Sequence, residues 1–173
     1  QTTFLKQYKE YGLNYAVSIG VMYTAGFWAA GIDSITGYWQ SLWYHGMNTP
    51  SSQAFAKAFT QKYKKPPENQ AWGDYIGVKI MAAAMEEAKS VDPAKIIPLL
   101  ESGMEFDILK PRKGQFRKGD HSLLQQMFVV KVKDKAEMQD EWDIFEIVEA
   151  SPGDNEKLDV IQSTQSENMC VMG

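Results

Sequence analysis

Three consecutive helix-forming segments between residues 49 and 101 divide the chain, and strand-forming patterns lie on both sides of this block. The first helix begins at Thr49-Pro50, a capping residue followed by the proline that suits a first helical turn. The second is the long apolar stretch 68–89, and the third begins at Asp92-Pro93. Few strands are predicted for this length, so the layout is awkward for one compact domain. We expect a chain that lacks its beginning.

The segments before and after the block predict an α/β fold. Before it we expect a helix over 3–11, a strand over 15–21, a short helix over 24–36 and an aromatic strand over 38–44. This alternation is typical of an α/β unit with a parallel sheet. After the block, residues 104–117 are irregular, strands follow over 126–133 and 141–149, and residues 151–173 form an acidic, mostly extended tail.

Composition excludes several classes of protein. With 44% hydrophobic and 23% charged residues, the 173-residue chain is folded rather than disordered. Three of its four net negative charges fall in residues 151–173, and the near-neutral remainder argues against a nucleic-acid partner. A window of about 18 apolar residues is absent, so we expect no membrane span. The first residues are polar, and a signal peptide is expected upstream.

Four motifs follow one another in a fixed order along the chain. A helix ends in a tyrosine and two prolines and leads to a small residue and a tyrosine on the long helix. A D-P-x-x-I-x-x-x-L helix follows, then a G-x-F-R-x-x-D-H turn, then a strand. In this sequence the motifs read YKKPP with Ala71 and Tyr75, DPAKIIPLL, GQFRKGDH and QMFVVKV. Together they resemble one family, the periplasmic substrate-binding proteins of ABC importers, nearest to the branched-chain amino-acid (Leu/Ile/Val) type. The N-terminal FLKQYKEYGLNYAVSIG resembles the family's helix, Gly-Leu, strand, Gly unit.

The resemblance implies a type I periplasmic-binding-protein fold, with two α/β lobes around a ligand cleft, of which this chain is a C-terminal portion. Residues 1–44 would belong to the second lobe and end in a hinge strand, and 45–110 would be the helical part of the first lobe. Residues 111–150 would return to the second lobe, with 151–173 as the tail. Two of three crossings would be 38–45 and 106–114. The implied protein is periplasmic and monomeric at full length, and delivers a small molecule to a membrane permease.

The resemblance and the aromatic density together predict a ligand-binding set. Helix N-termini and strand ends line clefts in open α/β sheets, which places the end of the first strand there. Relatives of the Leu/Ile/Val type carry an acidic residue near the position of Met22, so its absence favours a ligand with less positive charge or an aromatic carboxylate. A charge from outside the chain is the alternative. The predicted ligand-binding residues are Met22, Tyr23, Thr24, Trp43, Tyr44, Gln70 and Trp72, and each aromatic has core packing as its alternative.

Other functions have weaker support. Asp120-His121 is the most enzyme-like pair, but no nucleophile is obvious nearby, and we predict no catalytic residues and no cofactor. Two distant histidines and one tail cysteine make no metal site. Some relatives pair a C-terminal cysteine with one beside the D-H turn, where this chain has Gly119, so Cys170 stays a thiol or pairs upstream. A ligand-sensing ectodomain of the same fold is the main alternative to transport, and an enzyme using Asp120-His121 is the lesser one.

Overall fold

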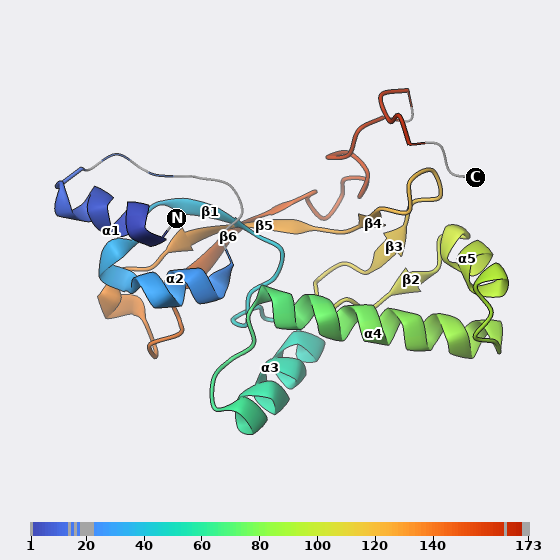
Figure 1. Cartoon of the computed structure of the whole chain (residues 1–173), viewed down its shortest axis with the longest axis horizontal. Helices are drawn as coiled ribbons and strands as arrows, with labels where there is room; N and C mark the ends of the chain where they lie inside the picture. Colours follow the sequence, from blue (N-terminus) through green and yellow to red (C-terminus); the bar gives the residue numbers. More distant parts are fainter. Residues whose placement is uncertain (1, 14, 16, 18–22, 165, 171–173) are drawn as a thin grey trace. The chain divides into compact units, whose positions relative to one another are not determined.

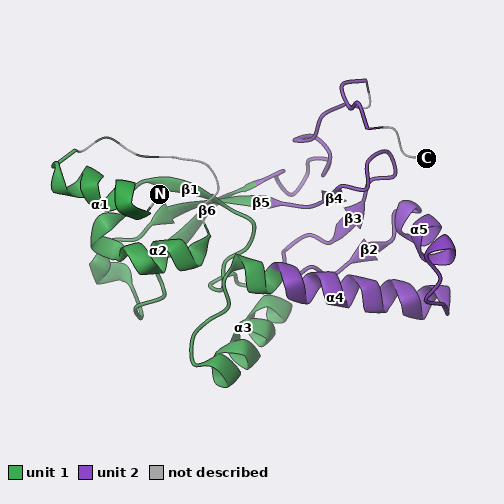
Figure 2. Cartoon of the chain, in the orientation of Figure 1, with its two compact units in different colours: residues 1–72, 127–150 green, residues 73–126, 151–173 purple. Residues whose placement is uncertain are grey.

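The structure is a computed structural model that describes residues 2–13, 15, 17, 23–164 and 166–170. It divides into two compact units, drawn in different colours in Figure 2. Unit 1 comprises residues 1–72 and 127–150, and unit 2 comprises 73–126 and 151–173. Among the described helices, none combines the length and the apolar character needed to cross a membrane. The lobe boundaries expected at 44/45 and 110/111 remain a prediction, since a compact unit is not by itself a lobe.

Unit 1 is built on a three-stranded sheet in the order β1-β5-β6, with helices α1 and α2 packed beside it (Figure 1). Its elements are α1 (Thr2–Glu10), α2 (Thr24–Ala30), η1 (Ile32–Ser34), β1 (Tyr38–Ser41), α3 (Pro50–Tyr63), the first turn of α4 (Asn69–Ala88), β5 (Met127–Val132), η2 (Lys135–Glu137) and β6 (Phe145–Ser151). Alternate residues of β5 are buried, as expected for a strand with one covered face. Phe27 of α2 meets Trp39 and Phe145 edge-on, at centroid distances of 4.7 and 4.9 Å.

The parallel pairing expected between the strands at 15–21 and 38–44 stays a prediction. β1 itself runs antiparallel to its neighbour β5, with Trp39 opposite Val130. The two strands come from opposite sides of the helical block, so local βαβ reasoning does not apply to them. The strand expected over 15–21 lies mostly outside the described residues, although Val17 is buried. A side chain at Gly37 would bring its Cβ within 2.8 Å of the Val17 carbonyl oxygen, and Gly37 has a φ of +85°. Glycine is therefore required there.

The helix starts predicted from sequence are confirmed. Thr49 caps α3 by accepting from the Ser52 N–H at 3.2 Å, and Pro50 is the first helical residue. Asp92 caps α5 (Pro93–Glu101) by accepting from the Ala94 N–H at 3.0 Å. These side chains satisfy N–H groups that have no partner within the helix. The 24–36 segment forms a shorter helix than expected, because α2 ends at Ala30 and Gly31 interrupts it.

Unit 2 contains most of α4, α5 and a small antiparallel sheet in the order β2-β3-β4. Its strands are β2 (Glu105–Phe106), β3 (Gly114–Phe116) and β4 (Leu123–Leu124). We expected irregular structure over 104–117. Strands of two or three residues are too short to produce a visible alternation of buried and exposed positions, so the sequence pattern missed them.

The C-terminal segment differs from the extended tail that we predict. After β6 the described residues form successive turns, and several of them are hydrogen bonded to the rest of unit 2. Arg117 donates to the Ser163 carbonyl at 2.8 Å, and the Asn168 side chain donates to Asp120 Oδ2 at 2.7 Å. Polar anchoring of this kind leaves no apolar periodicity in the sequence, which is why composition alone suggested an unpacked tail.

Candidate functional site

Two of the predicted ligand-binding tryptophans stack on each other in unit 1. Trp43 follows β1, and Trp72 lies in the first turn of α4. Their ring centroids are 6.5 Å apart and their planes differ by 4°. Phe55 of α3 meets Trp43 edge-on at 5.7 Å, and Trp43 Nε1 donates to Ser52 Oγ at 3.1 Å. Trp43 has no exposed surface and Trp72 is 4% exposed, so both help to build the interior around the start of α4.

The start of α4 also carries buried oxygen atoms that sequence reasoning missed. Glu68 Oε1 accepts from the Ala71 N–H at 3.0 Å and so caps the helix. Within the part of the chain that the structure describes, Glu68 Oε2 and Asn69 Oδ1 are buried and have no hydrogen-bond partner. Asn69 is only 4% exposed, whereas the neighbouring Gln70 is exposed. An unsatisfied buried acceptor is costly, so these atoms favour a donor from a bound molecule.

Tyr44 belongs to a different aromatic cluster, around the start of β6. Its hydroxyl donates to the Trp142 carbonyl at 3.0 Å and accepts from the Phe145 N–H at 3.2 Å. Burial raises the pKa of Tyr44 above its ordinary value of 10.0. Both hydrogen bonds of the hydroxyl are made to the protein's own backbone, and Tyr44 is only 3% exposed, so its contacts are those of a core residue.

His45 lies beside Tyr44, at a ring-centroid distance of 4.3 Å, and 5.9 Å from Trp28. Burial lowers the pKa of His45 from 6.5 to about 4. Its Nδ1 is buried and has no hydrogen-bond partner among the described residues. His45 is therefore a neutral imidazole at neutral pH.

We expect His45 to make the folded state less stable in acid. Its folded pKa of about 4 lies below its ordinary value of 6.5, so the unfolded chain binds more protons between these values. The free energy of unfolding should therefore fall as the pH falls from 6.5 to 4. Because the side chain is partly exposed, we expect His45 to contribute only about 2 kcal/mol to this fall.

Urea denaturation of the wild type and of His45→Gln across this pH range measures that contribution. The difference between their free energies of unfolding should change below pH 6.5 and stay constant between pH 7 and 8, which serves as the internal control. A difference that stays constant down to pH 4 would show that His45 is not shielded from protonation.

The remaining predicted residues are spread over other positions. Tyr23 is the N-cap residue of α2 and is 53% exposed, and Thr24 is its buried first residue. Met22 lies outside the described residues. The structure thus brings Trp43 and Trp72 together, whereas Tyr23 and Thr24 lie on α2 and Tyr44 on the β6 side of the core. The ligand-binding role of all seven residues remains a prediction.

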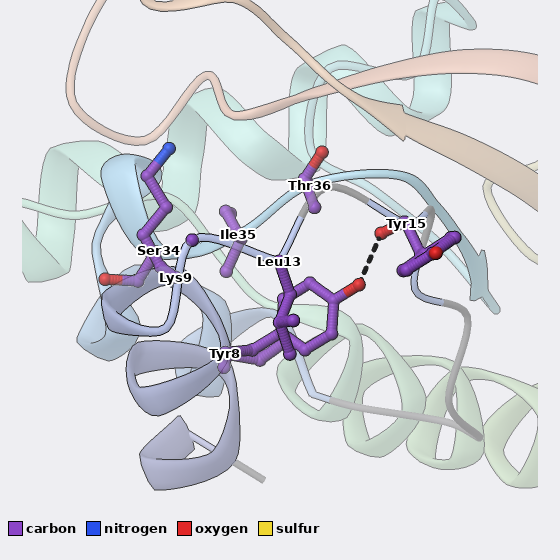
Figure 3. Close-up of a pocket in the computed structure, with 9 residues that line it drawn as sticks. Tyr8, Lys9, Leu13, Tyr15, Ser34, Ile35 and Thr36 are labelled. Carbon is purple, nitrogen blue, oxygen red and sulfur yellow. Dashed lines mark hydrogen bonds between the residues drawn. The ribbon is translucent and has the colours of Figure 1, made fainter.

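Two of the surface pockets that the described residues form lie in unit 1, and none of those seven residues lines either of them. One, of about 380 Å³, lies where the end of α1 meets the turn before β1 (Figure 3). Its Tyr8 hydroxyl donates to the Tyr15 carbonyl at 2.9 Å. The other, of about 650 Å³, lies between α3 and the turn at 140–142, with His45 in its lining.

Asp120 and His121 do not form an acid–base pair. The Asp120 carboxylate is held by the Arg117 guanidinium, with Nε donating to Oδ1 at 2.9 Å, and this hydrogen bonding lowers the pKa of Asp120. His121 Nε2 instead lies 2.8 Å from Glu101 Oε1. The two side chains therefore bond different partners in unit 2, Asp120 with Arg117 and His121 with Glu101. Among the described residues, no group of three or more His, Cys, Asp or Glu side chains is placed to hold a metal ion.

The chain is similar in sequence to a known protein family. The family described as periplasmic binding protein matches residues 1–137. A search among curated proteins found no match.

Solved structures provide similar relatives. An amino-acid ABC transporter substrate-binding protein from Pseudomonas fluorescens Pf-5 is 25% identical with a TM-score of 0.76, over 86% of this chain and 40% of that one. A branched-chain amino-acid ABC transporter periplasmic ligand-binding protein from Burkholderia xenovorans LB400 is 26% identical with a TM-score of 0.75, over the same shares. An ABC-type branched-chain amino-acid transporter protein from Rhodopseudomonas palustris CGA009 is 28% identical with a TM-score of 0.65, over 82% and 37%. This chain thus spans about 40% of the length of the first two relatives.

Proposed function

Because this chain belongs to the periplasmic binding protein family, we propose that it is part of a solute-binding protein that captures an amino-acid-like or aromatic carboxylate ligand. Two of these relatives are named as a substrate-binding and a periplasmic ligand-binding protein of ABC transporters, for amino acids and branched-chain amino acids respectively. The third is named as an ABC-type branched-chain amino-acid transporter. Their sequence identity of 25–28% supports the solute-binding role. The ligand and its delivery to a membrane permease are inferences from that likeness.

The proposed ligand class rests on the start of α4, where a helix N-terminus lies beside two buried oxygen atoms without hydrogen-bond partners among the described residues. The positive end of a helix dipole favours a ligand carboxylate. Asn69 Oδ1 and Glu68 Oε2 are buried acceptors that suit an ammonium or amide group of the same ligand. Trp72 lies in the same helical turn, and its ring, stacked on Trp43 and 4% exposed, keeps the surroundings of these acceptors apolar. A carboxylate at Glu68 would also supply the negative charge that Met22 cannot.

In the proposed protein, the ligand lies between two lobes that close on it by a hinge movement. Ligand stabilises the closed form by binding it more tightly than the open form, and a permease recognises the closed form. This role places the protein outside the cytoplasm, in the periplasm or tethered to the outer face of a membrane.

A thermal-shift screen of the full-length protein tests this function. We expect the unfolding midpoint to rise with at least one amino acid or aromatic carboxylate, because a ligand that binds only the folded state stabilises it. Asn69→Ala should lower the affinity for that ligand about tenfold, since it removes one hydrogen-bond acceptor.

Asn155→Ala, which changes an exposed asparagine in the C-terminal turns, should leave the affinity unchanged. If no amino acid, amide or aromatic acid raises the midpoint, the solute-binding proposal fails. If a ligand binds and Asn69→Ala has no effect, the site is not at the start of α4.

A further inference from the structure

Unit 2 contains a buried polar network at the two places where β5 and β6 join it. The chain passes from unit 2 to unit 1 between Gln126 and Met127, where β5 begins, and returns between Ala150 and Ser151, where β6 ends. Figure 2 shows the change of colour at these points. β5 and β6 are neighbours in the sheet of unit 1. The chain also passes from unit 1 to unit 2 within α4, between Trp72 and Gly73. Any movement of one unit relative to the other therefore involves α4 and these two neighbouring connections.

Lys110 holds the first connection. Its side chain is 5% exposed, and Nζ donates to the Gln126 carbonyl at 2.6 Å and to Gln125 Oε1 at 2.7 Å. Burial of a lysine is costly unless its N–H groups are bonded. The same burial lowers the pKa of Lys110 from 10.5 to about 7. A buried lysine that bonds a main-chain carbonyl at the first residue before β5 restricts the backbone there.

Gln126 links the first connection to the second. It is fully buried, and its Nε2 donates to the Pro152 carbonyl at 3.0 Å and to Asp154 Oδ1 at 3.3 Å. One side chain thus spans from the residue before β5 to the residue after β6.

Arg112 closes the network from the same loop that carries Lys110. Its guanidinium donates to the carbonyls of Gly153 and Glu156 at 2.7 and 2.8 Å. The turn that it holds is also closed internally, because the Gly153 N–H donates to Glu156 Oε2 at 2.7 Å. Three segments are therefore bonded to one another: 110–112, 125–126 and 152–156.

We propose that Lys110, Arg112 and Gln126 form a hinge anchor, which holds the unit-2 ends of β5 and β6 together as one rigid element. Bending between the units then takes place on the unit-1 side of these bonds, and the two strands move as a pair. The anchor is a property of unit 2, but its role in ligand capture rests on the proposed solute-binding function.

Hydrogen–deuterium exchange of the ligand-free, full-length protein tests the anchor. Lys110→Met and Gln126→Leu should each raise the exchange rate at least tenfold in the peptides that cover 125–130 and 151–157. Peptides from α5 should be unchanged. Lys113→Met is the matched control, because it removes a charge from the same loop at an exposed position and should change neither peptide.

Unchanged exchange in both variants, or equal acceleration over the whole of unit 2, overturns the anchor. If Lys110→Met does not fold, Arg112→Lys tests the anchor instead. It keeps the charge but loses the planar guanidinium, whose Nη1 donates both hydrogen bonds to the turn. It should accelerate exchange in 151–157 alone.

The hinge role has a separate readout, the rate of ligand dissociation. Once a ligand is identified, Gln126→Leu should release it several times faster than Lys113→Met does. If hydrogen–deuterium exchange accelerates locally but the rate of ligand dissociation is unchanged, the three residues are a structural anchor only, and the hinge role is overturned. Absence of any ligand counts against the proposed function, and the exchange result still decides the anchor.

Discussion

Replacing Trp43 with alanine should lower the free energy of unfolding by about 3 to 5 kcal/mol. The side chain has no exposed surface, stacks on Trp72 and bonds Ser52 Oγ through Nε1. Truncation removes these contacts, opens a cavity and leaves the Ser52 hydroxyl without this partner. Urea denaturation followed by far-ultraviolet circular dichroism measures the change.

Two further variants serve as comparisons for Trp43→Ala. Trp43→Phe keeps an aromatic ring and should cost about half as much or less. Tyr11→Ala removes an aromatic side chain that is 79% exposed, and should change the free energy of unfolding by no more than about 0.5 kcal/mol. A loss below about 1 kcal/mol for Trp43→Ala would mean that Trp43 is not a core residue, and would favour its predicted role as a ligand contact.

Lys110 should make the protein more stable as the pH rises above neutrality. Its folded pKa of about 7 lies below the ordinary 10.5, so between these values the unfolded chain binds the proton that the folded chain lacks. The free energy of unfolding therefore rises with pH over this range, by about 2 kcal/mol between pH 7 and 9 from this residue alone.

Denaturation of the wild type, Lys110→Met and Lys113→Met between pH 7 and 9 measures this effect. The wild type and Lys113→Met should share the upward slope, because Lys113 is exposed. Lys110→Met should lose it, whatever its absolute stability. Equal slopes in all three proteins would show that Lys110 remains charged in the folded state.

The sequence predicted the elements that carry strong local signals. The α3 and α5 starts are marked by a capping residue and a proline, and both are where the sequence placed them. The long helix was expected over 68–89 and is found over Asn69–Ala88, since its apolar residues and alanines favour a helix without tertiary help.

Strand ends were predicted less well, because tertiary contacts decide them. β1 ends at Ser41 rather than continuing to Tyr44, and the Ser41 hydroxyl there donates to the Trp43 carbonyl at 2.9 Å. β6 begins at Phe145 rather than at 141, because Asp140 Oδ1 accepts from the Trp142 and Asp143 N–H groups and closes a turn. An aromatic-rich sequence is compatible with both a strand and such a turn, so the sequence pattern does not locate the strand end.

The candidate site was predicted in part. Sequence reasoning selected Trp43 and Trp72, and the structure stacks them. It did not find Asn69 or Glu68, because an asparagine and a glutamate before a helix are ordinary capping residues whose burial no local pattern reveals. Nor did it single out Gln126, whose amide bonds a carbonyl 26 positions later in the chain.

The sequence by itself determined the family, the α/β class and the capped helices, because these depend on short-range spacing and on ordered motifs. Tertiary structure alone decided the antiparallel partner of β1, the short strands of unit 2, and the burial of Lys110, Gln126 and Asn69. These features depend on contacts between segments far apart in the chain. The free energy of burying a polar group is set by the partners that the fold brings to it, and not by its neighbours in sequence.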